Sequence, residues 1–178
     1  MLWILLSLSM VQPQLTFDFG RSDTNDWRPL VDGVMGGRST GSIEHGKNTM
    51  TFSGKLSLEN NGGFSSVRSP WEEVDMTVYQ EAAIRIKGDG RTYVFCLENA
   101  SFPTPYYTWE IKTVVGEWIE ITKPLRDFEQ KMVGRKTGRT INEDQLATVR
   151  RVGLMLSDKN PGDFAVRSTT SASAKYSF

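Results

Sequence analysis

The sequence has very little of the chemistry that most catalytic and metal sites require. It contains one cysteine and one histidine in 178 residues. One cysteine excludes an intramolecular disulfide and a multi-cysteine zinc site, and one histidine excludes the two-histidine metal motifs. The formal net charge is zero, so no general attraction to nucleic acid or to anionic lipid is expected. We therefore predict no metal, no cofactor and no nucleic-acid partner.

The sequence also lacks an apolar run long enough to span a bilayer. Residues 1–11 (MLWILLSLSMV) are almost wholly apolar, but a spanning helix needs about 20 such residues. The run has no basic residue before it, no small-residue cleavage site after it, and none of the arginine-rich character of a mitochondrial transit peptide. For the N-terminal segment 1–14, a cleaved secretory signal, a weak membrane anchor and an imperfect gene start all stay open. The compartment stays open with them.

What the chain has instead is glycine at short intervals. From Thr16 onward, β-prone segments are separated by glycine-rich turns about every ten residues, which is typical of a sandwich or barrel. No βαβ rhythm, internal repeat or interdomain linker is seen. We predict an all-β fold, a two-sheet antiparallel sandwich of jelly-roll type, as a single domain over residues 15–168. A Ser/Thr/Ala-rich tail is expected over residues 169–178.

Turn residues predict how neighbouring strands are paired. Asp-Gly and similar dipeptides supply the positive-φ positions that tight hairpins need. Three hairpins are predicted, joining 39–44 to 49–52, 83–87 to 92–98 across Gly88-Asp89-Gly90, and 106–115 to 118–122 across Gly116-Glu117. A central strand is predicted at 152–156, a last strand at 164–166, a short helical turn at 142–149 with Asn142 as N-cap, and a long basic connection at 124–139.

Two glycine clusters are the densest local signals. Residues 32–39 hold three glycines in five positions, and residues 60–68 hold two glycines beside Phe64. Neither is a phosphate-binding loop, because no Gly-Lys-Ser/Thr follows. One hypothesis is that these loops present side chains to a partner or ligand. The simpler alternative is that they are tight structural turns at the edge of the sandwich.

Aromatic and basic residues supply further candidates. Among Tyr106, Tyr107, Trp109 and Trp118, adjacent residues face opposite ways, and we expect Tyr107 and Trp109 in the core. The others could form a platform for a sugar ring or an apolar partner. The basic residues of the 123–139 stretch could contact an acidic surface, an interaction that salt should weaken, or could form a solvated loop. The candidate partner- or ligand-binding residues are Asp32, Met35, Arg38, Phe64, Arg68, Tyr106, Trp118, Arg126 and Arg135.

Catalysis has only a remote candidate. Glu98, Glu110 and Glu120 would lie on neighbouring strands, and glycosidases use two carboxyl groups about 5–10 Å apart. Alternating acids on strands usually face water, so a hydrolase built on Glu110 and Glu120 is the weakest of the hypotheses. The single carboxylate of Gly88-Asp89-Gly90 is too few for calcium. We predict no catalytic residue and no enzyme.

Several ordered motifs extend from Phe17 to Val166. They are Trp27, Val31-Asp32-Gly33-Val34-Met35-Gly36-Gly37-Arg38-Ser39, Gly41, Phe52-Ser53-Gly54, Asn61 to Arg68, Lys87 to Tyr93, Gly116-Glu117-Trp118, Phe128, Gly134-Arg135, Val152 to Met155, and Ser157-Asp158. Together these motifs resemble the complex I intermediate-associated protein 30 family.

The resemblance implies a galactose-binding-like β-sandwich with a non-catalytic, chaperone-like role in assembling respiratory complex I in mitochondria. Its partner would then be a protein, an assembly intermediate of a membrane complex, with weak membrane association through the N-terminal segment. The fold is shared with carbohydrate-binding modules, so a carbohydrate- or other small-ligand-binding module is the alternative. The chain departs from the family after Phe164, where a Ser/Thr/Ala-rich sequence replaces an acidic, apolar last strand.

Overall fold

The computed structural model describes residues 14–17, 26–47, 49–101 and 103–175. The apolar segment predicted at the N-terminus lies outside the described residues up to residue 13, as does Asn48 in the first hairpin tip. Within the described ranges, no helix has both the length and the apolar character needed to cross a membrane.

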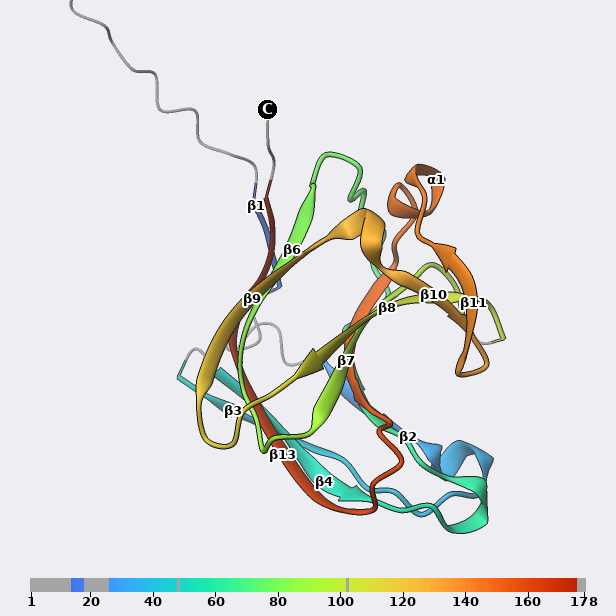
Figure 1. Cartoon of the computed structure of the whole chain (residues 1–178), viewed down its shortest axis with the longest axis vertical. Coiled ribbons are helices and arrows are strands. Elements are labelled where there is room, and N and C mark those ends of the chain that lie inside the picture. Colours follow the sequence, from blue (N-terminus) through green and yellow to red (C-terminus); the bar gives the residue numbers. More distant parts are fainter. Residues whose placement is uncertain (1–13, 18–25, 48, 102, 176–178) are drawn as a thin grey trace, which may run out of the picture.

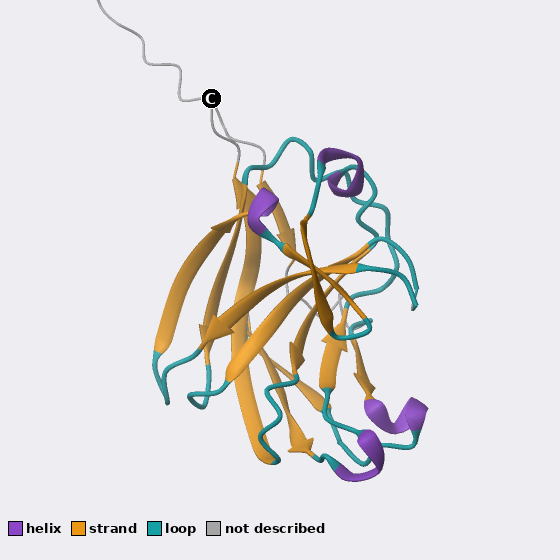
Figure 2. Cartoon of the chain, turned by 45° about the vertical axis from the view of Figure 1, so that its right-hand side comes forward, coloured by secondary structure: helices purple, strands orange, loops and turns teal. Residues whose placement is uncertain are grey.

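Two antiparallel sheets pack face to face, as predicted (Figures 1 and 2). Sheet A has the strand order β3 (Ser42–Gly46), β4 (Thr49–Leu56), β13 (Gly162–Lys175), β6 (Glu81–Lys87) and β9 (Trp118–Pro124), with β1 (Gln14–Phe17) also paired to β13. Sheet B has the order β11 (Arg135–Thr140), β10 (Glu129–Met132), β8 (Tyr106–Lys112), β7 (Thr92–Glu98), β12 (Arg151–Leu156), β5 (Ser65–Arg68) and β2 (Arg28–Val31). The helical turns are η1 (Asp32–Met35), η2 (Glu59–Asn61), η3 (Leu125–Asp127) and α1 (Glu143–Leu146).

The core lies between the sheets and follows the period-two pattern of the strands. On β7, Tyr93, Phe95 and Leu97 point into it and are nearly inaccessible to solvent. Phe95, Trp109 and Phe128 pack edge to face, with ring centroids 6.1–6.5 Å apart. The prediction that Trp109 and Tyr107 belong to the core is confirmed.

Several elements agree with the sequence. The first hairpin is the β3–β4 pair, with Ser42 opposite Ser53 and Gly46 opposite Thr49. Strand β12 lies between β7 and β5, as a central strand should. Helix α1 begins with a capping box, in which Asn142 Oδ1 accepts from Gln145 N (3.0 Å) and Gln145 Oε1 accepts from Asn142 N (2.9 Å).

The second and third predicted hairpins are wrong. The strands exist, but β6 and β9 pair with each other in sheet A, whereas β7 and β8 pair with each other in sheet B. Each glycine-rich turn therefore carries the chain from one sheet to the other. An Asp-Gly turn signals a reversal of the chain, and it does not specify which strand becomes the neighbour.

Two other stretches contain more strand than predicted. The basic stretch 124–139 is not a simple connection, because β10 and β11 form a hairpin there. Strand β13 continues past the expected end at residue 166 to Lys175, pairing with β6 and β1. Serine and alanine have little intrinsic preference for strands, so tertiary pairing decides this segment.

The two sheet-changing turns are locked together at Gly88. Thr113 Oγ1 accepts from Gly90 N (3.1 Å) and donates to Arg91 O (2.8 Å), while Gly116 N donates to Gly88 O (3.0 Å). A Cβ on Gly88 would overlap the side chain of Thr113, with 2.6 Å to its Cγ2.

We predict that Gly88→Ala lowers the free energy of unfolding by about 1–3 kcal/mol, because the added methyl group displaces Thr113. Chemical denaturation measures this loss. Thr113→Gly removes the whole obstructing side chain, including the Cβ that would lie 2.5 Å from the new methyl group. The double variant should therefore be more stable than the sum of the two single losses implies. If the two single losses simply add in the double variant, the contact between residue 88 and the Thr113 side chain is not the cause of the loss in Gly88→Ala.

Candidate functional site

Asp32 is a buried structural residue that joins the two glycine clusters. It is 1% exposed. Its Oδ1 accepts from Ser39 N (2.9 Å), and its Oδ2 accepts from Ser39 Oγ (2.6 Å), Gly63 N (2.6 Å) and Phe64 N (3.2 Å). The hypothesis that Asp32 is presented to a partner is therefore wrong, and the structural alternative holds for this residue.

The glycines are explained by how closely the backbone approaches this carboxylate. A Cβ on Gly62 would lie 2.6 Å from Asp32 Oδ2, and a Cβ on Gly37 would overlap the same carboxyl group. Gly36 and Gly63 have φ values of 87° and 128°, which L-amino acids with side chains rarely adopt. Both clusters thus wrap around one buried charge.

The pKa of Asp32 is lowered by its hydrogen bonds. Burial alone would raise it, but the donors from the Ser39 hydroxyl and from the Gly63, Ser39 and Phe64 backbone outweigh that effect. The folded carboxyl is therefore more acidic than an unfolded one. The stability that it contributes is present above the ordinary pKa of about 3.9 and is lost as pH falls through the folded value.

We predict that Asp32→Asn lowers the free energy of unfolding at pH 7 by about 3 kcal/mol, because the amide loses the charge and one acceptor position among four donors. The difference from wild type should begin to shrink below about pH 4, where the unfolded carboxyl takes up a proton, and should be lost once pH falls through the lower pKa of the folded carboxyl. Denaturation curves between neutral and acid pH test both points. Asp75→Asn is the matched control and should change much less, because Asp75 is exposed and accepts its hydrogen bonds from the nearby Thr77.

Apolar side chains stand exposed on the turns that Asp32 supports. Val34 and Met35 on η1 are 74% and 62% exposed, and Leu58 before η2 is 41% exposed; we call these three residues the η1–η2 tip. Asn60 Nδ2 donates to Gly36 O (3.1 Å), which ties η2 to η1. Arg38 forms an exposed ion pair with Glu59 (3.1 Å), so the nearest charges neutralise each other. The candidates Met35 and Arg38 therefore lie at the surface of a well-fixed turn.

Phe64, Arg68 and Tyr106 come together on the outer face of sheet B, the face away from the core. The registers of β5, β7, β8 and β12 place them beside Val94, Cys96 and Met155. Val94, Cys96 and Met155 form a second, small apolar cluster, against which Phe64 and Tyr106 pack half-buried. Burial raises the pKa of the Tyr106 hydroxyl, and the backbone of Gly134 hydrogen-bonds to it.

A buried ionic network crosses this outer face. Arg68 Nη1 lies 2.5 Å from Glu98 Oε1, and Arg151 Nη2 lies 2.5 Å from Glu98 Oε2. The side chains of Arg68 and Glu98 are each 9% exposed. Arg68 passes directly over Gly153, where a Cβ would lie 2.8 Å from its Nη1. Arg151 also stacks on the ring of Trp71, with its guanidinium carbon 3.9 Å from the ring centroid.

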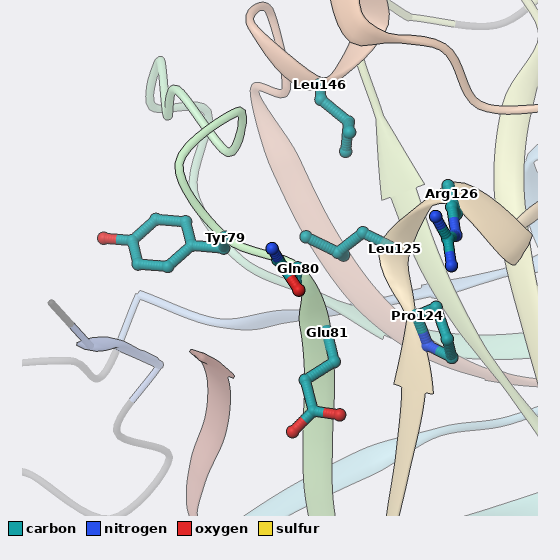
Figure 3. A pocket seen from close by; sticks show the side chains of 7 residues that line it. All are labelled: Tyr79, Gln80, Glu81, Pro124, Leu125, Arg126 and Leu146. Atoms are coloured by element: carbon teal, nitrogen blue, oxygen red, sulfur yellow. The ribbon is translucent and has the colours of Figure 1, made fainter. Parts of the chain in front are cut away.

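Of the remaining candidates, Trp118 and Arg126 are separate from this face, whereas Arg135 follows Gly134 on a strand of sheet B. Trp118 lies on β9 in sheet A, with the Arg85 guanidinium 4.8 Å from its ring centroid. Arg126 lines a shallow cavity of about 300 Å³ with Tyr79, Gln80, Glu81, Pro124, Leu125 and Leu146 (Figure 3). Arg135 is exposed on β11. The nine candidates are therefore spread over several surfaces.

The carboxylate pair proposed for a hydrolase is wrong in its geometry. Glu110 is on β8 in sheet B and pairs with Lys131 (3.0 Å), whereas Glu120 is on β9 in sheet A. Ile119 and Ile121 pack toward the core, so Glu120 faces outward from the other side of the sandwich. Among the residues that the structure describes, no three His, Cys, Asp or Glu side chains gather where they could hold a metal ion.

The sequence analysis did not predict that Glu98 bridges two arginines in an ionic network, or that Arg151 and Trp71 belong to the same surface. It also did not single out Leu58. Glu98 and Arg151 are opposite each other in the β7–β12 register. Only the correct pairing of these distant strands could have revealed the ion pair. Leu58 had a local signal, an apolar residue two positions before the second glycine cluster.

We predict that Glu98→Gln lowers the free energy of unfolding by about 3 kcal/mol, because it leaves the Arg68 and Arg151 guanidinium groups without a compensating charge. Glu110→Gln, on the same face but half exposed, should cost less than about 1 kcal/mol. Chemical denaturation at pH 7 distinguishes the two. Equal losses would mean that the network is not effectively buried.

The fold is shared with carbohydrate-binding modules. The family 11 carbohydrate-binding module of the cellulosomal cellulase Lic26A-Cel5E of Clostridium thermocellum has 16% sequence identity and a TM-score of 0.62, with 90% of this chain and 95% of that one covered. A family 11 carbohydrate-binding module from Clostridium thermocellum in complex with a β-1,3-1,4-mixed-linked tetrasaccharide gives 16% identity and a TM-score of 0.63 over 92% of this chain and 98% of that one. At this identity the similarity establishes the two-sheet jelly-roll fold alone.

The family model of complex I intermediate-associated protein 30 matches residues 17–167. The chain belongs to this family, and the resemblance noted in its motifs is confirmed. No curated protein matches the chain significantly.

Proposed function

We propose that this protein is a non-catalytic, protein-binding factor with a chaperone-like role in the assembly of respiratory complex I. The observation that carries the proposal is the family match, which covers nearly the whole described domain, residues 17–167. The mitochondrial setting suggested by the family is part of the same proposal. Solved structures with this fold include non-catalytic binding modules, which is consistent with a binding role.

The η1–η2 tip is the surface that we assign to the partner. Val34 and Met35 expose most of their area on a turn fixed by a buried carboxylate. A turn that is already ordered loses little conformational entropy when it binds, and methionine is enriched at protein interfaces. The Arg38–Glu59 pair leaves the edge of the tip without net charge. The partner surface should accordingly be apolar and uncharged.

We predict that Val34→Ser/Met35→Ser reduces co-migration with a membrane-complex subassembly on native gels by about tenfold, because the apolar contact area is lost. Val114→Ser/Val115→Ser is the matched control, since it changes two exposed adjacent apolar residues far along the chain. Its co-migration should equal that of wild type. A wild-type protein that runs only as a free monomer in extracts of its own cells would contradict the assembly role.

A carbohydrate- or small-ligand-binding module is the second candidate, favoured by the structural similarity to such modules. Half-buried Phe64 and Tyr106 on the outer face of sheet B would be the platform. Against it, Arg151 covers one face of Trp71, Arg85 covers one face of Trp118, and Trp109 is in the core. Calorimetry with a mixed-linked β-glucan tetrasaccharide and a wider glycan panel decides this candidate. Heat that disappears in Tyr106→Ala would establish it, and no heat with any glycan would exclude it.

A further inference from the structure

The tip of the β10–β11 hairpin has an unusual residue at its apex. Met132 and Arg135 are the last paired residues, so Val133 and Gly134 form a two-residue turn. Their φ values are 49° and 75°, as in a type I′ turn. Such turns normally carry Asn-Gly or Asp-Gly, because a β-branched side chain is strained at positive φ. Valine is therefore present at this position against the local conformational preference.

The strained valine is also exposed. Val133 is 60% exposed and the adjacent Met132 is 45% exposed. Packing against the rest of the protein thus offsets little of the cost of this conformation. Strain of this kind is most easily understood where the side chain is used outside its own fold.

The residues flanking the apex are basic. Between Glu129 and Thr140 there are four lysines and arginines and one acid. All six residues of β11 are exposed, Arg135 and Arg139 among them. Lys136 pairs with Glu129 (2.7 Å), and Lys131 pairs with Glu110 (3.0 Å). A net charge of zero for the whole chain therefore conceals a local excess of positive charge around this apolar apex.

We propose that the β10–β11 hairpin binds the surface of an anionic lipid bilayer. Met132 and Val133 enter the boundary between headgroups and acyl chains, while Arg135 and Lys136, next to the apex, lie at the level of the phosphates. Arg139 lies farther from the apex on β11 and adds to the electrostatic attraction at longer range. A bilayer fits this hairpin better than a protein does. It accepts an exposed apolar apex without a matching pocket, and its phosphates attract the four basic side chains of the hairpin, whose charge Glu129 and Glu110 balance only in part. The proposal is independent of the assembly role and of the N-terminal apolar segment.

Val133→Asn tests the proposal without disturbing the fold, because asparagine tolerates positive φ and makes the common Asn-Gly turn. The full-length variant should unfold at the wild-type temperature or higher. Val115→Asn is the matched control, since Val115 is 73% exposed and lies outside the hairpin. Flotation with vesicles of phosphatidylcholine containing about 30 mol % phosphatidylglycerol, at about 0.1 M salt, measures binding.

We expect wild type and Val115→Asn to bind these vesicles equally, and Val133→Asn to bind at least about fivefold more weakly. Arg135→Gln/Arg139→Gln should lose the preference over pure phosphatidylcholine vesicles and most of the salt dependence.

Three results would overturn the proposal. The first is that the wild-type protein does not bind anionic vesicles, and the second is that Val133→Asn binds them as well as wild type does. The third is that soluble polyglutamate displaces the protein from the vesicles because the protein binds polyglutamate more tightly, in a way that depends on Val133. The second would assign vesicle binding to another part of the chain, and the third would assign the hairpin to an acidic protein.

Discussion

The buried carboxylate of Asp32 is the interaction on which the proposed recognition surface depends. A single side chain accepts hydrogen bonds from Ser39, Gly63 and Phe64, and so fastens two segments that are about thirty residues apart in sequence. The backbone must approach the carboxylate closely, which is why Gly37 and Gly62 have no room for a Cβ. A charge buried in this way is tolerated only while its donors stay in place. The constraint therefore orders both turns together.

The exposed and buried polar features of the molecule have different roles. Around Asp32, the buried hydrogen bonds fix the turn on which Val34 and Met35 are exposed to solvent. On the outer face of sheet B, the Arg68–Glu98–Arg151 network instead holds β5, β7 and β12 in register. Because desolvating these charges costs free energy, the intact network adds little net stability. Removing one partner alone is nevertheless strongly destabilising, because it leaves the other charges buried without compensation. At the β10–β11 hairpin, by contrast, no buried charge among the described residues fixes the turn, and the apolar residue Val133 occupies a strained backbone conformation with a φ of 49°.

The fold class was predictable from the sequence, and the pairing of strands was not. Alternation at Tyr93, Phe95 and Leu97 predicted a strand with one face in the core, and the structure agrees. Gly88-Asp89-Gly90 predicted a turn, but the turn changes sheets because its contacts are with Thr113 on another connection. Of the candidate site residues, Met35 and Arg38 are exposed, whereas Asp32 is buried. A carboxylate beside glycines can be displayed or enclosed, and only contacts with the distant Gly63 decide between the two.

The pKa of Asp32, measured by carbon-13 NMR titration of its carboxyl carbon, tests this account most directly. The account predicts a midpoint clearly below the ordinary value of about 3.9, with the backbone amide signals of Ser39 and Gly63 shifting at the same midpoint because they donate to that carboxylate. A midpoint at or above the ordinary value, or amide signals that ignore the titration, would show that this carboxylate does not hold the two turns together.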